Sequence, residues 1–370
     1  MENNAIHVLQ SAAIIGEILP WYAAAHNLPS NREQQVRACL AELEMPLKAV
    51  GITSEMIAEA LLDADSRPGK TLADAQRMAS NASTNQDSGT LRPILEVLGQ
   101  GMTTPKYRFP VVSLSATEDI FPREQVSAPD HRALWRAFVT DWAMLPTSSA
   151  EGLLETAYHL VLRHAAFLPA AAIQGGIVAL PDHAKVVAAM ASCLHEAESK
   201  NEKPFLLVGG DLSGIQTFLY DIISKNASKL LKGRSFYLQL LIDSVLDELL
   251  AALNLSSLHV VYASGGGFFL LVPHTDHHLE ILHKVEASLA ERIFAVHQIQ
   301  LTFSWLPWLS GKRTCRMAAS PRFGNSSSKQ AMPRRSRNSP GKCLRQRTSL
   351  PPVKSEGTKV ATPSPTRNLA

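Results

Sequence analysis

The feature that most constrains the fold is a regular alternation of apolar runs and helical periodicity over residues 203–309. Four apolar runs of strand length are separated by two stretches in which apolar residues recur at helical spacing. The runs occupy residues 205–208, 258–263, 268–272 and 300–305, and the helical stretches include 237–253 and 282–293. The resulting β-α-β-β-α-β order predicts a ferredoxin-like domain, with the first helix beginning near Ser213 and a break near Lys232-Gly233.

The part of the chain before this domain has a different pattern. Residues 1–79 and 130–198 are mainly helical by spacing, so the overall fold class is α+β. A polar stretch predicts a linker over residues 80–100, and a mainly helical connecting region then extends over 101–202. Within that region, residues 107–115 have the composition of a short edge strand.

Charge divides the sequence into two unlike parts. Residues 311–370 carry 14 Lys and Arg against one acid, a net of +13, whereas the whole chain is only +3. We therefore expect 310–370 to be a disordered basic tail, either translated out of frame or a genuine RNA-binding arm. Four scattered cysteines, no basic leader and no uninterrupted apolar span favour the cytoplasm and predict no membrane contact.

A glycine-rich segment follows the first predicted strand. Gly209-Gly210-Asp211-Leu212-Ser213-Gly214-Ile215-Gln216 lies between a strand and a helix, where backbone N–H groups can approach a phosphate. Asp211 is a candidate Mg²⁺ ligand. The alternative is a tight turn in which Asp211 or Ser213 caps the helix.

A second glycine segment, Gly265-Gly266-Gly267, lies at the predicted hairpin tip. Palm-type polymerases and cyclases place metal-binding carboxylates at such a tip, but this turn contains no acid. The alternative is a turn that requires positive φ angles. The basic segment 229–235 is predicted as a loop, which either contacts a phosphate or is a solvated surface.

None of the 13 histidines is followed by Asp, so the chain lacks the adjacent pair that an HD-type metal site uses. His7, His26 and Asp65 are the candidates for remnants of such a site, or else capping and surface residues. The divalent metal of an HD site is therefore expected to be lost.

Several segments together resemble one family. Phe205–Leu241, Val261–Phe269, Ala179–Ala189 and Leu61–Ser66 are similar to the large subunit of type III-A CRISPR effector complexes, the Csm-subtype polymerase-cyclase family. The resemblance extends over residues 5–308. It implies a degenerate HD-like region at 1–79 and a first palm domain at 203–309.

The resemblance also implies an activity and partners. In that family an HD domain cuts single-stranded DNA, and a second palm with Gly-Gly-Asp-Asp makes cyclic oligoadenylate from ATP and Mg²⁺. The implied partners are other type III-A subunits and a guide RNA, with target RNA and single-stranded DNA contacted through the complex. The implied nucleotide contacts are carried over to these residues: Asp211, Ser213, Gly214, Gln216, Gly265, Gly266 and Gly267.

The sequence departs from the family because the His-Asp dyad, the paired cysteines and the Gly-Gly-Asp-Asp palm are absent. We therefore expect a catalytically incomplete fragment of the large subunit, truncated after its first palm. One alternative is a non-catalytic module that binds a nucleotide or an RNA complex. Another is a free-standing cyclase, against which the lack of a carboxylate partner for Asp211 argues.

Overall fold

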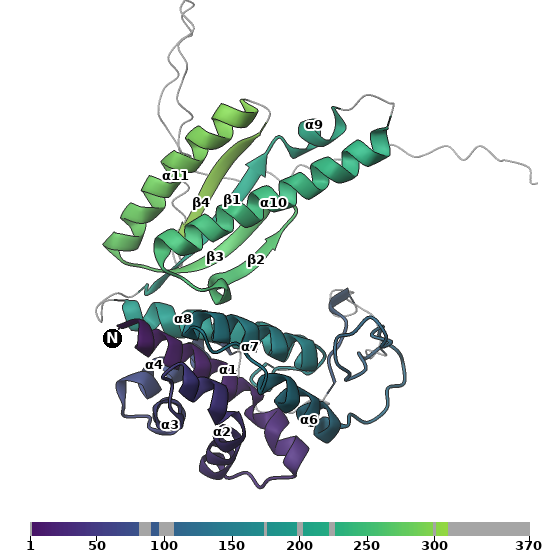
Figure 1. The fold of residues 1–370 in the computed structure, drawn as a ribbon, viewed down its shortest axis with the longest axis vertical. Helices are drawn as coiled ribbons and strands as arrows, with labels where there is room; N and C mark the ends of the chain where they lie inside the picture. The colour runs from purple at the N-terminus through teal and green to yellow at the C-terminus, as the bar shows by residue number, and fades with distance from the viewer. Residues whose placement is uncertain are drawn as a thin grey trace, which may run out of the picture. The chain divides into compact units, whose positions relative to one another are not determined.

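The computed structural model describes residues 2–80, 90–95, 107–173, 176–197, 203–221, 226–298 and 301–309. The predicted linker falls largely, and the predicted basic tail entirely, outside the described residues. Within them, helices come first and a four-stranded sheet with its own helices follows (Figure 1). The α+β class predicted from the sequence is confirmed. The predicted domain boundaries remain predictions.

The N-terminal part of the chain is a helical bundle. Its helices are α1 (Glu2–His26), α2 (Arg32–Ala49), α3 (Ser54–Leu62), α4 (Arg67–Ala79), α6 (His131–Trp142), α7 (Ala150–Ala165) and α8 (Leu180–Glu196). Short polar side chains cap most of the helix starts, because each accepts a backbone N–H that the helix leaves unpaired. The N-cap side chains that do so are Asn31, Thr53, Ser66, Asp130 and Ser149.

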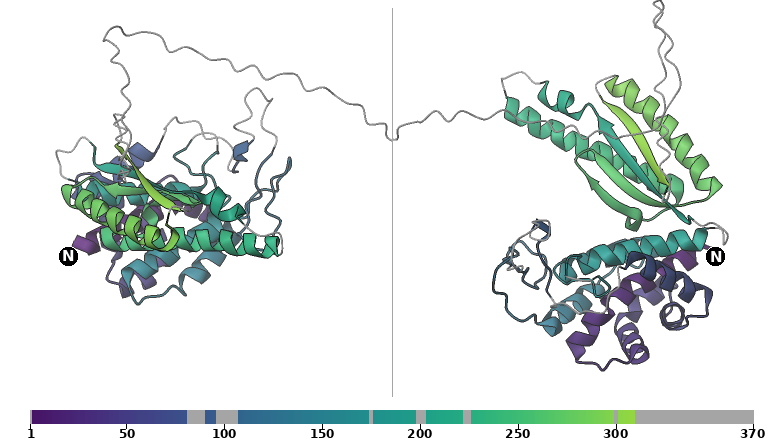
Figure 2. Two further views of the ribbon diagram at one scale, coloured as in Figure 1. Left: turned by 90° about the horizontal axis from the view of Figure 1, so that it is seen from above. Right: turned by 180° about the vertical axis from the view of Figure 1, so that it is seen from behind.

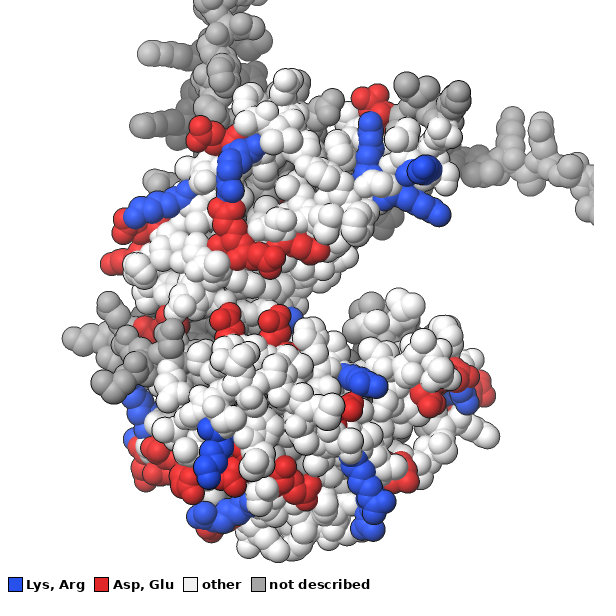
Figure 3. Space-filling model, viewed as in Figure 1, with Lys and Arg blue, Asp and Glu red and all other residues white. Residues whose placement is uncertain are grey.

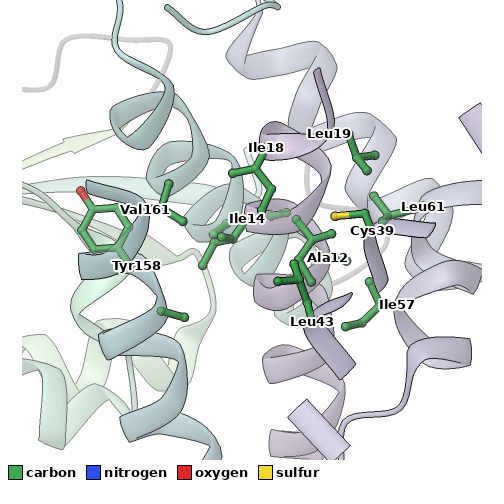
Figure 4. Packing of buried hydrophobic residues seen from close by; sticks show 14 of the residues in the cluster. Ala12, Ile14, Ile18, Leu19, Cys39, Leu43, Ile57, Leu61, Tyr158 and Val161 are labelled. Atoms are coloured by element: carbon green, nitrogen blue, oxygen red, sulfur yellow. The ribbon is translucent and has the colours of Figure 1, made fainter. Parts of the chain in front are cut away.

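Helix α1 lies inside this bundle. Ile14 and Ile18 are at most 1% exposed, and Figure 4 shows them between side chains of α2, α3 and α7. The segment Asn4–His26 is long and apolar enough to cross a membrane by length and composition, but 78% of its most apolar window is buried. An apolar helix buried on all sides is what a protein core requires.

Residues 203–309 form the predicted β-α-β-β-α-β unit, which we call the palm. Its elements are β1 (Phe205–Ser213), α9 (Ile215–Tyr220), α10 (Ala227–Leu253), a 3₁₀ turn η1 (Ser257–His259), β2 (Val260–Ser264), β3 (Gly267–Pro273), α11 (Asp276–His297) and β4 (Thr302–Leu309). The strand order is β2-β3-β1-β4, and all neighbours are antiparallel. Because strand side chains alternate between faces, each face of this sheet has its own set of contacts.

The two sheet faces have different surroundings. Helices α10 and α11 cover one face, where Val208, Leu270 and Val272 join one apolar cluster with Leu249 and Leu289. The turned view of Figure 2 shows that these two helices leave the other face uncovered. On that second face Leu271 packs with Ala189 and Cys193 of α8. We refer to this second face as the open face.

Two local predictions about the palm elements were wrong. Strand β1 does not end at Gly209 but continues through Asp211 to Ser213, because β3 and β4 both pair with it along this length. Helix α10 passes through Gly233 without a break, since one helical glycine costs only about 1 kcal/mol. The helical region instead divides between α9 and α10.

The predicted edge strand at 107–115 also does not form. Within its described residues, only an isolated bridge between Arg108 and Arg123 has strand pairing. The segment lies along the bundle instead, where the Leu114 amide donates to the Arg163 carbonyl. Pro110, which lacks an N–H donor, removes one hydrogen bond that a strand would need.

Candidate functional site

Asp211 lies near the end of the central strand β1. It is paired with Gly267 of β3 on one side and with Ser304 of β4 on the other. Asp211 and Ser304 are exposed. Strand alternation places Asp211 on the open face, because its neighbours Gly210 and Leu212 point toward α10 and α11.

The hairpin glycines fit closely against this strand end. Gly265 and Gly266 have φ angles of 66° and 93°, which L side chains rarely adopt. A Cβ on Gly266 would lie 2.1 Å from Ile215 Cδ1, so the hairpin approaches α9 closely. A Cβ on Gly267 would lie 3.3 Å from the Asp211 Oδ1 atom. The structure therefore brings the predicted hairpin glycines and Asp211 together.

The remaining predicted contacts follow β1. Gly214 has a φ of 92° and turns the chain into the six-residue helix α9. Ser213 and Gln216 are both exposed beside this turn. The Leu212 amide donates to the Gly266 carbonyl at 2.9 Å, which ties the turn to the hairpin. Neither predicted cap is formed, because the N-cap of α9 is Gly214 and has no side-chain hydrogen bond.

Gly210 has a different role from that of its neighbours. A Cβ at this position would lie 2.4 Å from Phe268 Cζ and 2.8 Å from Phe303 Cζ. These two rings stack at 6.0 Å between the sheet and its helices. Gly210 is thus required by aromatic packing on the covered face, and it does not face the candidate site.

An aromatic pair on the open face was not foreseen from the sequence. Tyr262 and Phe269 pair across β2 and β3 with ring centroids 6.3 Å apart. Their residues are 52% and 43% exposed, so both rings are accessible on this face. Phe269 lies two residues after Gly267, so it is a diagonal neighbour of Asp211 on one face.

The residues at this strand end do not form a metal site on their own. Asp211 is the only acidic residue among the predicted contacts, and its paired neighbours are Gly267 and Ser304. In the described part of the chain, no three His, Cys, Asp or Glu side chains converge on a point that could hold a metal ion. The donor set thus does not fit a resident Mg²⁺, which requires several oxygen ligands.

His7 and His26, two of the three candidate remnants of an HD site, are far apart. His7 and His26 lie 19 residues apart on α1, a separation of about 28 Å at 1.5 Å per residue. His26 Nε2 is 3.5 Å from Glu42 Oε1, and Asp65 lies in the turn between α3 and α4. Burial lowers the pKa of His7, although Glu151 partly offsets this. The structure does not bring these residues together.

The basic segment 229–235 is helical and not the predicted loop. Lys229 and Lys232 are exposed on the first turns of α10. Arg234 instead turns back to the end of α9, where it donates to the carbonyls of Phe218 and Asp221. Its guanidinium also lies 5.2 Å from the centroid of the Phe218 ring. Arg234 is therefore an anchor between helices.

Comparisons with known proteins agree with this architecture. A family model described as Csm1 subunit domain B matches residues 204–313. Curated relatives named "CRISPR system single-strand-specific deoxyribonuclease Cas10/Csm1 (subtype III-A)" are 33% identical over 146 residues in Enterococcus italicus and 39% identical over 117 residues in Mycobacterium tuberculosis. A third, from Thermococcus onnurineus, is 27% identical over 252 residues.

These matches cover only parts of the relatives. The three alignments include 34%, 27% and 65% of this chain but 19%, 14% and 31% of the relatives. Among solved structures, Csm1 from T. onnurineus aligns with a TM-score of 0.62 and 21% identity, covering 82% of this chain and 45% of that one. A Csm1–Csm4 cassette bound to ATP aligns with a TM-score of 0.63 and 20% identity over 82% and 44%.

The structural likeness reaches beyond the palm, since its coverage of 82% exceeds the share of the chain that the domain B model matches. At this level of identity it shows the fold alone. The sequence matches are a second line of evidence, because sequence identity is measured separately from the similarity in fold. Residues 204–313 accordingly match the Csm1 domain B model, and the chain is similar in sequence to Cas10/Csm1 proteins of subtype III-A.

Proposed function

We propose that the palm provides one nucleotide-binding wall in a type III-A antiviral effector complex. The observation that carries this proposal is the arrangement of the open face, where exposed Asp211 lies against Gly267 and next to the Tyr262–Phe269 pair. Structures with the same fold include Csm1–Csm4 cassettes bound to ATP, pppApApA and cA4. An adenine nucleotide is therefore the ligand we assign to this face.

The two groups of side chains would contact different parts of that nucleotide. An exposed aromatic ring can stack on a base, which contributes about 1–3 kcal/mol. The hydroxyl groups of Ser213 and Ser304, the Gln216 amide and the backbone of Gly265–Gly267 offer polar contacts to ribose and phosphates. All of these groups lie around the end of β1.

The proposed role is binding rather than chemistry. Phosphoryl transfer of this kind needs two metal ions held by several carboxylates, and Asp211 supplies only one. Oligoadenylate synthesis would then require carboxylates from another domain or chain. The same reasoning applies to the deoxyribonuclease activity in the relatives' names, since His7 and His26 are far apart on α1 and no metal-binding group is found among the described residues.

We propose partners of the same kind as those of the relatives. A Csm4-type subunit is the first, because solved structures of similar fold are Csm1–Csm4 complexes. Guide RNA, target RNA and single-stranded DNA would be contacted through the assembled complex in the cytoplasm. Co-expression with a Csm4-type subunit should yield a complex that survives gel filtration. Separate elution of the two proteins would contradict this part of the proposal.

ATP binding by the purified chain tests the central proposal. We expect Tyr262→Ala and Phe269→Ala each to weaken ATP binding about tenfold, since each removes a stacking surface. Phe121→Ala is the matched control, because Phe121 is an exposed ring, 74% accessible, in the N-terminal part of the chain. Equal affinity in all three variants, or no ATP binding by the unaltered chain, would refute the proposal.

A further inference from the structure

A cavity of about 400 Å³ lies between helices of the bundle and the end of α10. We call it the acidic pocket. Four carboxylates line it: Glu151 and Glu155 of α7, Glu196 of α8 and Asp247 of α10. Gln10 and His259 line it as well. No Lys or Arg is found among its described lining residues, so the charged side chains that line it are predominantly acidic.

Two buried side chains add unpaired acceptors to this pocket. Gln10 is 1% exposed, and its Nε2 atom donates to Ser192 Oγ and Ser256 Oγ, both at 3.0 Å. Both hydrogen bonds are donated by Nε2, so neither of them involves the carboxamide oxygen Oε1. That oxygen is buried and has no partner in the described part of the chain. A buried acceptor without a partner costs about 1–3 kcal/mol.

His259 is the second such group, and it is also 1% exposed. Its Nδ1 atom lies 3.2 Å from the Ser256 carbonyl oxygen, an acceptor, which assigns the proton to Nδ1. Nε2 then carries a lone pair, and it too is buried without a partner among the described residues. Burial lowers the pKa of His259 to about 4, so the ring is neutral near pH 7.

The four carboxylates line the same pocket as Gln10 and His259. Glu151, Glu155 and Asp247 are exposed, whereas Glu196 is half-buried and lies 3.5 Å from His278 Nε2. Figure 3 shows acidic side chains on both the palm and the helical bundle on the viewed face. The pocket therefore combines two buried acceptors without a partner in the described part of the chain, Gln10 Oε1 and His259 Nε2, with an excess of negative charge.

We propose that the acidic pocket binds a linear organic cation with several protonated amines, of the polyamine class. An ammonium group is a pure hydrogen-bond donor, so it can satisfy Gln10 Oε1, His259 Nε2 and the carboxylates alike. A single metal ion fits less well, since no three of the described His, Cys, Asp and Glu side chains converge on one point. Acceptors spread over about 400 Å³ match an elongated cation instead.

Calorimetric titration of the full chain with spermidine tests this inference, with putrescine and Mg²⁺ as comparison probes. We expect spermidine to bind most tightly and its affinity to fall as NaCl is added, because exposed charges are screened. The double variant Glu151→Gln/Glu155→Gln should weaken binding about fivefold, as expected for the loss of two exposed ion pairs. Asp247→Asn should also weaken spermidine binding.

The matched control is Glu59→Gln/Glu291→Gln, which removes the same charge at exposed positions outside the pocket. Spermidine should also shift the His259 ring resonances, while Mg²⁺ should not. An equal loss of affinity in the pocket and control variants would show general counterion binding and refute the proposal. Absence of spermidine binding, or an unmoved His259 resonance, would refute it as well.

Discussion

Glu17 and His183 meet inside the helical bundle, where Glu17 Oε2 lies 2.8 Å from His183 Nδ1. Both residues are buried, with exposures of 7% and 3%. The contact joins α1 to α8 across 166 positions of sequence. Gln76 of α4 approaches the second Glu17 oxygen at 3.5 Å. A buried carboxylate in this position connects three helices whose other contacts are mostly apolar.

Removing Glu17 should therefore destabilise the bundle strongly. We expect Glu17→Ala to lower the free energy of unfolding by about 3 kcal/mol, because His183 loses its buried partner. Glu33→Ala is the control, since Glu33 pairs with Arg37 on the exposed surface and such pairs contribute about 0–1 kcal/mol. Urea unfolding measures both. Similar losses for the two variants would contradict the structural role of the buried pair.

Gly210 and Gly233 should respond in opposite ways to alanine. Gly210→Ala forces a Cβ against Phe268 and Phe303, so we expect a loss of about 1–3 kcal/mol in stability. Gly233 lies within α10, and a Cβ there would meet no atom of the described residues within 4 Å. Gly233→Ala should therefore stabilise by about 0.5–1 kcal/mol. A stable Gly210→Ala variant, measured by urea unfolding, would show that this packing is wrong.

The stability of the chain should depend on pH through His259. Burial lowers its pKa to about 4, against 6.5 in an unfolded chain, while the Ser256 carbonyl partly offsets burial and nearby His278 adds to it. Between these two values the unfolded state binds the additional proton. The contribution of His259 is therefore complete above pH 6.5 and is lost as pH falls toward 4.

The full loss from this one group is on the order of 3 kcal/mol. His259→Gln cannot titrate, so its unfolding free energy should fall less steeply between pH 6.5 and 4 than that of the unaltered chain. The other histidines are present in both proteins, so their contributions cancel when one pH profile of the unfolding free energy is subtracted from the other. Identical pH profiles for the two proteins would show that His259 is not the titrating group.

We expect the chain alone to make no cyclic oligoadenylate. Asp211 is the one carboxylate among the candidate nucleotide contacts, whereas two-metal chemistry needs several. Incubation with ATP and Mg²⁺, followed by mass spectrometry, measures the products. Cyclic products from the purified chain that disappear in Asp211→Asn would show that this strand end is catalytic.

Much of the palm could be predicted from the sequence, because its strands are short apolar runs and its helices have clear apolar spacing. The predicted boundaries of strands and helices are wrong where tertiary contacts determine the local conformation. Gly209 and Gly210 resemble a turn, yet they continue β1 because β3 and β4 pair with it on both sides, and the Phe268 and Phe303 rings occupy the space beside Gly210. The sequence around these glycines does not show which distant side chains pack against them.

The candidate site was foreseen only in part for a similar reason. Asp211 and the hairpin glycines are adjacent to recognisable turns, so their proximity followed from the order of elements. The pairing of Tyr262 with Phe269 depends on an irregularity between Val260 and Tyr262 that shifts the register of β2. A one-residue shift moves a side chain to the other face, and hydrophobic patterning does not reveal it.

Amide hydrogen exchange with and without ATP tests the central claim most directly, because it locates the ligand. We expect slower exchange on adding ATP over Leu212–Gln216 and Ser264–Phe269, the two segments that meet at the end of β1. Amide exchange in α2 should be unchanged, since that helix belongs to the helical bundle and not to the palm. Protection confined to the bundle, or no protection at saturating ATP, would contradict the assignment of the open face as a nucleotide-binding surface.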